Sequence, residues 1–192
     1  NEVKMLWQHY HHASSFEEAA ALLAKNPETT RIIAGGTDLL VEKRNGLRKD
    51  VVTLVDISRI PDAGEIWMDD EKVIHLDACV THSDCVNSEL LRENAKLLVQ
   101  ACYTVGSPQI RNRGTVAGNL VTASPANDTI TPLMALGASV HLLSRSGKRV
   151  VPVKEFYQGV RRTVMQPDEL VVEITFNALA KNQESVFLKH AL

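Results

Sequence analysis

The stretch that decides the fold is "RIIAGGTDLLVEKRNG", residues 31–46. It predicts a buried strand that ends at Gly35 and Gly36, followed by a short helix that Gly46 closes. A glycine turn between a strand and a helix points several backbone N–H groups in one direction, and such a nest attracts phosphate. The other interpretation is a tight structural turn with Asp38 as the helix N-cap. The local sequence leaves both open.

The segments around this stretch complete a small β/α unit. Ser15 and Glu18 form a capping box ahead of a helix in "FEEAAALLAKN", residues 16–26. "VVTLVDIS", residues 51–58, is an apolar run typical of a buried strand. We therefore predict a first lobe over residues 1–56 with parallel strands.

The pattern changes after residue 56. Hairpins are predicted over residues 64–80, with the turn at Asp69 to Glu71, and over residues 139–153, with Ser146 and Gly147 in the turn. Helices are predicted over residues 81–106, with one break near Asn87 and Ser88, and over residues 128–137, with Asp128 as the cap and Gly137 at the end.

"PDELVVEITF", residues 167–176, reads as a last strand. The second lobe is accordingly predicted over residues 57–178, with an antiparallel sheet and helices. "SVFLKHAL", residues 185–192, alternates like a strand that enters another domain, so residues 179–192 are interpreted as the start of a truncated C-terminal domain. The fold class expected is α+β.

Composition narrows the function classes. A chain of 192 residues with a hydrophobic fraction of 44% can bury the core of one domain or of two lobes. Its net charge of -2 favours neither nucleic acid nor an anionic membrane as partner. No apolar run approaches the roughly 18 residues that span a bilayer, and the N-terminus lacks a signal pattern, so a cytoplasmic location is expected.

Cysteine and histidine usage points away from metal on this chain. Cys79, Cys85 and Cys102 form no CxxC pair, so they are interpreted as reduced thiols without an iron–sulfur cluster. The histidines at positions 9, 11 and 12 have no carboxylate at ligand spacing, so we expect no metal there.

A second stretch, "NRGTVAGNLVTASPAND" at residues 112–128, combines small and polar residues. Low bulk with frequent hydroxyl and amide groups fits a surface that wraps a polar ligand, and a glycine-rich sheet edge is the alternative. No GxSxG motif or other nucleophile pattern is present. If the chain takes part in catalysis, a cofactor carries the reaction.

Together, "AGGTDLL", "PQIRNRGTVAGNLVTASPANDTITPLMALGASVHLLS" and "PDELVVEI" resemble the FAD-binding subunit of the molybdenum hydroxylases. This family includes xanthine dehydrogenase, aerobic carbon monoxide dehydrogenase and nicotinate dehydrogenase. The resemblance runs from about Phe16 to the end of the chain. It implies a fold of the vanillyl-alcohol-oxidase (PCMH) type, with FAD between two α+β lobes.

The resemblance also implies the cofactor-binding residues. It places the pyrophosphate over the turn at Gly35, Gly36 and Thr37, and Val171 and Lys189 near the flavin. Ala117 replaces a glycine that relatives usually have, and Val105 replaces an aromatic residue of some relatives. The implied FAD-binding positions are Ile32, Ile33, Ala34, Gly35, Gly36, Thr37, Asp38, Leu39, Val105, Thr115, Ala117, Gly118, Asn119, Thr122, Asp128, Val171 and Lys189. From the local sequence alone, Asp128 would be interpreted as a helix cap and Lys189 as a surface lysine.

The function that the resemblance implies is electron transfer through FAD. A large partner subunit would carry a molybdenum cofactor, a small one two-iron clusters, and NAD or another acceptor would receive the electrons. No side chain of this chain is expected to be catalytic. Two alternatives remain at this stage. One is a stand-alone flavin-dependent reductase similar to that of cell-wall precursor synthesis, and the other is a scaffolding subunit without FAD.

Overall fold

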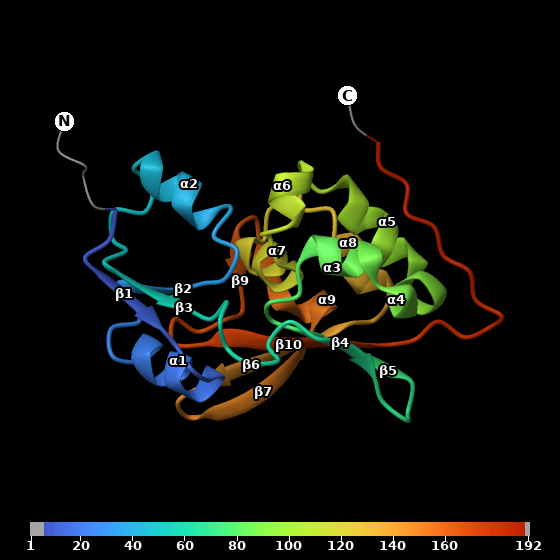
Figure 1. Ribbon diagram of the computed structural model, residues 1–192, viewed down its shortest axis with the longest axis horizontal. Helices are drawn as coiled ribbons and strands as arrows, with labels where there is room; N and C mark the ends of the chain where they lie inside the picture. The colour runs from blue at the N-terminus through green and yellow to red at the C-terminus, as the bar shows by residue number, and fades with distance from the viewer. Residues whose placement is uncertain (1–5, 191–192) are drawn as a thin grey trace.

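Figure 1 shows a small lobe beside a larger one, in a computed structural model that describes residues 6–190. The small lobe holds a three-stranded parallel sheet in the order β1-β3-β2. Its elements are β1 (His9–His12), α1 (Phe16–Leu23), β2 (Thr30–Ile33), α2 (Leu39–Arg44) and β3 (Thr53–Asp56). The parallel β/α unit predicted around the glycine stretch is confirmed.

The capping box predicted before α1 is half formed. Ser15 has extended backbone, and its hydroxyl accepts a hydrogen bond from the Glu18 N–H at 3.1 Å. The Glu18 carboxylate instead accepts bonds from the backbone N–H and hydroxyl of Ser14, at 2.7 and 2.6 Å. Ser15 therefore caps α1 as predicted, while Glu18 reaches one residue farther back.

The large lobe is built on a five-stranded antiparallel sheet in the order β4-β5-β10-β6-β7. Both predicted hairpins and the predicted last strand are present. In the second hairpin Ser144 pairs with Gly147, so Arg145 and Ser146 form the turn, one residue earlier than predicted. The strands of this lobe are β4 (Ile66–Met68), β5 (Val73–Asp77), β6 (Ser139–Ser144), β7 (Gly147–Pro152), β10 (Leu170–Asn177) and a separate pair, β8 (Tyr157–Gly159) and β9 (Arg162–Thr163).

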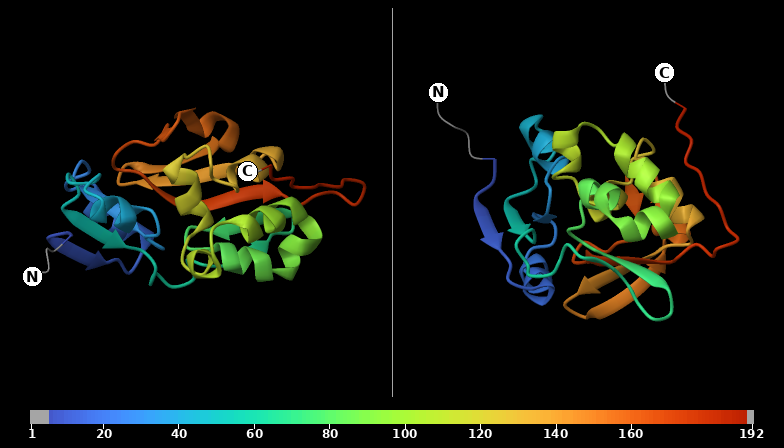
Figure 2. Two further views of the ribbon diagram at one scale, coloured as in Figure 1. Left: turned by 90° about the horizontal axis from the view of Figure 1, so that it is seen from above. Right: turned by 45° about the vertical axis from the view of Figure 1, so that its right-hand side comes forward.

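Helices cover one face of this sheet, as the two views in Figure 2 show. The predicted break at Ser88 is confirmed, and a second break falls at Ala95, whose φ of -153° and ψ of 45° are not helical. Leu91 and Leu98 are fully buried in the same core as Ile74 and Ile174 of the sheet. The helices are α3 (His82–Asn87), α4 (Glu89–Asn94), α5 (Lys96–Thr104), α6 (Pro108–Arg111), α7 (Val116–Thr122), α8 (Ile130–Ala135) and α9 (Val153–Phe156).

One hydrophobic core joins the two lobes. Ala19 and Leu23 of α1 and Val55 of β3 belong to the same buried cluster as Val140 and Leu142 of β6. Across the described range 6–190, no helix has the length and apolar character needed to cross a membrane.

Three local predictions are wrong. The Asp38 side chain makes no capping bond, because its backbone (φ -92°, ψ -51°) is already helical, whereas capping side chains are positioned by extended backbone. Asp128 does not cap α8 either: Thr129 precedes that helix, and Asp128 bonds Thr104 and Lys189 instead. Residues 185–190 form no strand, because alternation stabilises a strand only where a sheet edge is available to pair; Ala191 and Leu192 lie outside the described residues.

Candidate functional site

Glycine is required at the two positions after β2 for different structural reasons. Gly36 has a φ of +70°, in the left-handed region that favours glycine. A Cβ on Gly35 would lie 1.8 Å from the carbonyl oxygen of Arg113, so a side chain there is sterically excluded. The pair therefore turns the chain at Gly36 and lets it touch the second glycine-bearing stretch at Gly35.

Residues 116–122 of that second stretch form the helix α7, and Thr115 makes only an isolated bridge with Thr81 instead of a sheet edge. Thr115 has extended backbone and caps α7: its hydroxyl accepts a hydrogen bond from the Gly118 N–H at 3.0 Å. The Thr122 hydroxyl donates to the Gly118 carbonyl at 2.7 Å. Ala117 lies inside α7 with a negative φ and is 5% exposed, so its methyl group packs in the core. Alanine in place of the glycine of relatives therefore causes no backbone strain.

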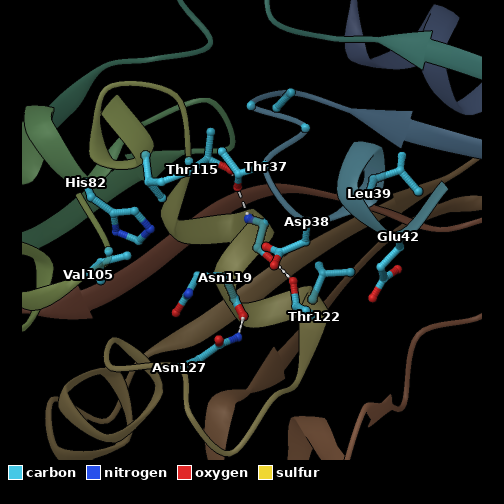
Figure 3. Close-up of a pocket in the computed structure, with 18 of the residues that line it drawn as sticks. Thr37, Asp38, Leu39, Glu42, His82, Val105, Thr115, Asn119, Thr122 and Asn127 are labelled. Atoms are coloured by element: carbon cyan, nitrogen blue, oxygen red, sulfur yellow. Dashed lines mark hydrogen bonds between the residues drawn. The ribbon is translucent and has the colours of Figure 1, made fainter. Parts of the chain in front are cut away.

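The two stretches line one cavity of about 620 Å³ between the lobes (Figure 3). Most of the residues predicted to bind FAD surround it. They are Ile32, Ile33, Ala34, Gly35, Gly36, Thr37, Asp38, Leu39, Val105, Thr115, Gly118, Asn119, Thr122, Asp128 and Lys189. The other two, Ala117 and Val171, line a neighbouring cavity of about 490 Å³. Ile32, Ala34, Thr115 and Gly118 line both cavities, so the two adjoin along these residues.

Ion pairs hold charged side chains around the first cavity. The Glu42 carboxylate accepts hydrogen bonds from Arg48 at 2.7 Å and from Arg161 at 2.9 Å. Arg161 lies between β8 and β9, so its bond to α2 joins the two lobes. Lys189, which also lines this cavity, donates to Asp128 at 2.7 Å. The cavity wall therefore carries both basic groups and acceptors for hydroxyl donors.

Asn119 is held in place by its neighbours. Its side-chain oxygen accepts a hydrogen bond from the hydroxyl of Thr129, which is fully buried. Its backbone carbonyl accepts a bond from the Asn127 side-chain amide. Asp38, by contrast, is exposed and makes no capping bond, so its carboxylate is available to a ligand.

Eleven residues line this cavity that the sequence did not predict, and His82, Glu42 and Arg161 are among them. His82 is only 2% exposed, and its backbone N–H donates to the Gly114 carbonyl at 3.1 Å. A bridge between Thr81 and Thr115 sets this contact. Because the bridge joins positions far apart in the sequence, no local pattern identifies His82 as a cavity residue.

Two thiols lie in the core near His82, outside the lining of both cavities. Cys85 and Cys102 are fully buried and hydrogen-bonded to each other. That bond, followed by burial, raises the pKa of the Cys85 thiol well above its ordinary value. At the interface between the lobes, burial raises the pKa of Cys79 to about 12. Cys79 and Cys85 are therefore neutral thiols at neutral pH, which makes both poor nucleophiles.

The chemistry of this site is binding. The cavity offers a backbone turn, helix-capping hydroxyls, amides and paired charges, and among residues 6–190 no group of three or more metal-ligating side chains is assembled. Two adjoining cavities between the lobes, with one glycine-bearing stretch from each lobe, fit an elongated ligand.

Comparison with known proteins identifies the family. Residues 3–176 match the family described as "FAD binding domain in molybdopterin dehydrogenase", and the chain belongs to that family. It is 36% identical to the nicotinate dehydrogenase FAD-subunit of Eubacterium barkeri over 182 residues. This match covers 92% of this chain and 60% of that protein. It is 31% identical over 172 residues to the carbon monoxide dehydrogenase medium chain of Hydrogenophaga pseudoflava, covering 90% of this chain and 59% of that one.

Solved structures agree on the fold. A carbon monoxide dehydrogenase from Hydrogenophaga pseudoflava superimposes with a TM-score of 0.85 at 31% identity, over 91% of this chain and 60% of that chain. A glucooligosaccharide oxidase from Acremonium strictum shares the fold alone, with a TM-score of 0.53 and 14% identity, over 90% of this chain and 36% of that chain. The predicted α+β fold of the vanillyl-alcohol-oxidase type is confirmed. The chain spans about 60% of the length of the relatives it matches.

The residues present fit FAD. Gly35, Gly36, Gly106, Gly114 and Gly118 all line the first cavity, which brings its wall close to the backbone. A Cβ on Gly118 would lie 2.9 Å from the Thr115 hydroxyl, so glycine at this position leaves the helix cap undisturbed. The volume of each of the two adjoining cavities falls in the range of small-molecule and cofactor sites.

Proposed function

We propose that this chain is the FAD-binding, electron-transferring part of a molybdenum-dependent dehydrogenase. A large subunit with the molybdenum cofactor would oxidise the substrate, and a small subunit with two-iron clusters would pass the electrons on. This chain would deliver them through FAD to NAD or another acceptor. The observation that supports the proposal is the cavity between the lobes, lined by both glycine-bearing stretches.

In this proposal the chain's residues bind and orient the cofactor. The turn at Gly35 to Thr37 and the start of α7 at Thr115 face the pyrophosphate, and Asp38, Asn119 and Asp128 contact hydroxyl groups of FAD. Val171, in the second cavity, packs near the flavin. FAD itself supplies the redox chemistry, since it accepts and releases electrons in single steps or in pairs.

Lys189 would set the electrostatics near the flavin. Its side chain is 38% exposed and bonds Asp128, whose side chain is 13% exposed. A cation held beside the flavin stabilises negative charge on the ring, which favours the reduced form. No side chain is assigned a role as acid or base.

FAD binding tests the proposal directly. The purified chain is expected to take up FAD and show flavin absorbance in the visible range. Gly118→Leu is expected to abolish uptake, because Gly118 lines both cavities. Since a side chain there would also press against the Thr115 cap, circular dichroism first establishes that the variant folds. Gly64→Leu is the matched control, because Gly64 lines neither cavity and a Cβ there has no neighbour closer than 3.9 Å.

Other outcomes would favour the alternatives. A folded wild-type chain that takes up no FAD would contradict the proposal and favour a scaffolding role. Oxidation of NADPH by the FAD-loaded chain without partner subunits would favour a stand-alone reductase. Electron transfer to FAD only in the presence of partner subunits is the expected result.

A further inference from the structure

The chain that follows β10 has no regular secondary structure, but it stays close to the helices. It leaves the sheet and runs along the outside of α4 and α5 (Figure 1). The N–H of Leu179 donates to the carbonyl of Asn94, the last residue of α4, at 2.9 Å. Ten residues later, Lys189 lines the first cavity. This part of the chain therefore brings a cation from the end of β10 to the wall of the site.

Burial alternates over residues 185–189, which we call the docked segment. Ser185 and Phe187 are half-buried, whereas Val186 and Leu188 are 64% and 84% exposed. Such alternation is typical of an extended chain with one face against the protein. The alternating sequence here thus marks a chain that lies on a helix surface instead of pairing with a sheet.

Two hydrogen bonds connect the docked segment to the rest of the described chain. The Phe187 N–H donates to the side-chain oxygen of Gln100 at 3.0 Å. The Lys189 ammonium donates to the Asp128 carboxylate at 2.7 Å, and the same carboxylate oxygen accepts a bond from the Thr104 hydroxyl at 3.2 Å. Both connections therefore lead back to side chains of α5.

The spacing of these two side chains matches the docked segment. Gln100 and Thr104 are four residues apart in α5, so they lie on one face of the helix, about 6 Å apart along its axis. An extended chain covers about 6.6 Å between Phe187 and Lys189. Because the two distances are similar, a segment fixed at Gln100 brings Lys189 to the carboxylate that Thr104 holds.

Both side chains act from outside the site. Neither Gln100 nor Thr104 lines either cavity, so a ligand in the cavities does not touch them. The single hydrogen of the Thr104 hydroxyl is shared between Asp128 and the Ala101 carbonyl, which is nearer at 2.8 Å. Gln100 is therefore the stronger of the two anchors.

We propose that Gln100 and Thr104 are positioning residues that dock the segment on α5 and thereby hold Lys189 at the cavity wall. The inference rests on the proposed function, in which Lys189 is the cation beside the flavin. The interaction between two charges weakens with distance, so a lysine on an undocked segment stabilises the reduced flavin less. Docking on α5 thus raises the flavin potential through residues that never touch the cofactor.

The test measures the midpoint potential of the flavin in the FAD-loaded chain. Lys189→Met removes the cation and is expected to shift the potential to more negative values. Gln100→Leu should shift it in the same direction by less, and the double variant should match K189M, because Gln100 acts through Lys189. Gln109→Leu is the matched control: Gln109 is an exposed helical glutamine outside both cavities, and its loss should leave the potential unchanged.

Hydrogen exchange measures the docking itself and needs no cofactor. Q100L removes the acceptor of the Phe187 N–H, so that amide should exchange about two- to tenfold faster, the equivalent of one neutral hydrogen bond. Thr104→Val keeps the shape of the side chain without its hydroxyl and should shift the potential in the same direction as Q100L by a smaller amount. If Q100L does not fold, Gln100→Ala removes the same acceptor and replaces it in both measurements.

Several results would overturn the inference. Unchanged exchange of the Phe187 amide in Q100L would show that Gln100 does not dock the segment. A double variant whose shift equals the sum of the two single shifts would show that Gln100 acts independently of Lys189. A wild-type chain that takes up no FAD contradicts the proposed function itself, whereas a FAD-loaded Q100L chain with the wild-type potential contradicts only the positioning role.

Discussion

The two glycine-bearing stretches line the same cavity but are stabilised in different ways. The first is a turn between β2 and α2, and it depends on the absence of side chains at Gly35 and Gly36. The second is the start of α7, and it depends on side chains that are present: the Thr115 cap and the Thr122 bond to Gly118. Glycine is thus a conformational requirement in one stretch and mainly a source of space in the other.

This difference explains why Ala117 is compatible with the site. A methyl group inside a helix enters the core, whereas the same group on Gly35 would meet the Arg113 carbonyl at 1.8 Å. Substitutions in the first stretch should therefore affect folding before binding. Substitutions in the second stretch should lower the free energy of unfolding by less.

Gly35→Ala is expected to have the largest effect. Its Cβ would meet backbone atoms, which move less readily than side chains, so the loss in unfolding free energy should exceed about 3 kcal/mol, the ordinary limit for overpacking. Urea unfolding measures it, and Gly64→Ala is the control, since Gly64 has open space and no positive φ. A G35A chain as stable as G64A would show that the two stretches do not touch.

Gly36→Ala should lower the free energy of unfolding by less, about 2 kcal/mol. Part of this is the left-handed backbone at φ +70°, and part is contact with the Ile33 side chain at 2.9 Å, which can move aside. Gly137→Ala isolates the backbone part, because Gly137 has φ +65° and no neighbour within 4 Å, and it should cost about 1 kcal/mol. Equal losses in both variants would mean that the Ile33 contact is harmless.

Thr115→Ala should have the smallest effect of the three, about 1 kcal/mol, because it removes one capping bond from α7. Thermal unfolding measures the change, and Thr115→Ser, which keeps the hydroxyl, should restore most of it. A loss in T115A larger than that in G36A would reverse the comparison between the stretches.

Sequence patterns predict the sheets well, because alternation and apolar runs report burial directly. Both hairpins, the parallel unit and β10 follow from such patterns. The helix over 116–122 does not, because glycine and threonine are weak helix formers; it forms through its cap and through burial of Val116 and Leu120.

The features that the sequence could not predict depend on contacts between residues far apart in the chain. Asp128 has the residue type of a cap, but Lys189, 61 positions away, binds its carboxylate. The place of His82 on the cavity wall depends on a bridge between Thr81 and Thr115. Most of the residues that the resemblance implies for FAD binding line the cavity, although the resemblance gives no information on these partners.

The order of strands in the small lobe affects how the chain is assembled during synthesis. β3 is the last of the three strands in the sequence but lies in the middle of the sheet, so β1 and β2 have no common partner until residue 56 has been made. The turn at Gly35 then waits for Arg113, more than fifty residues later, before it packs. The small sheet can therefore form only after β3 has been synthesised, and the contact at Gly35 only after Arg113 has been added.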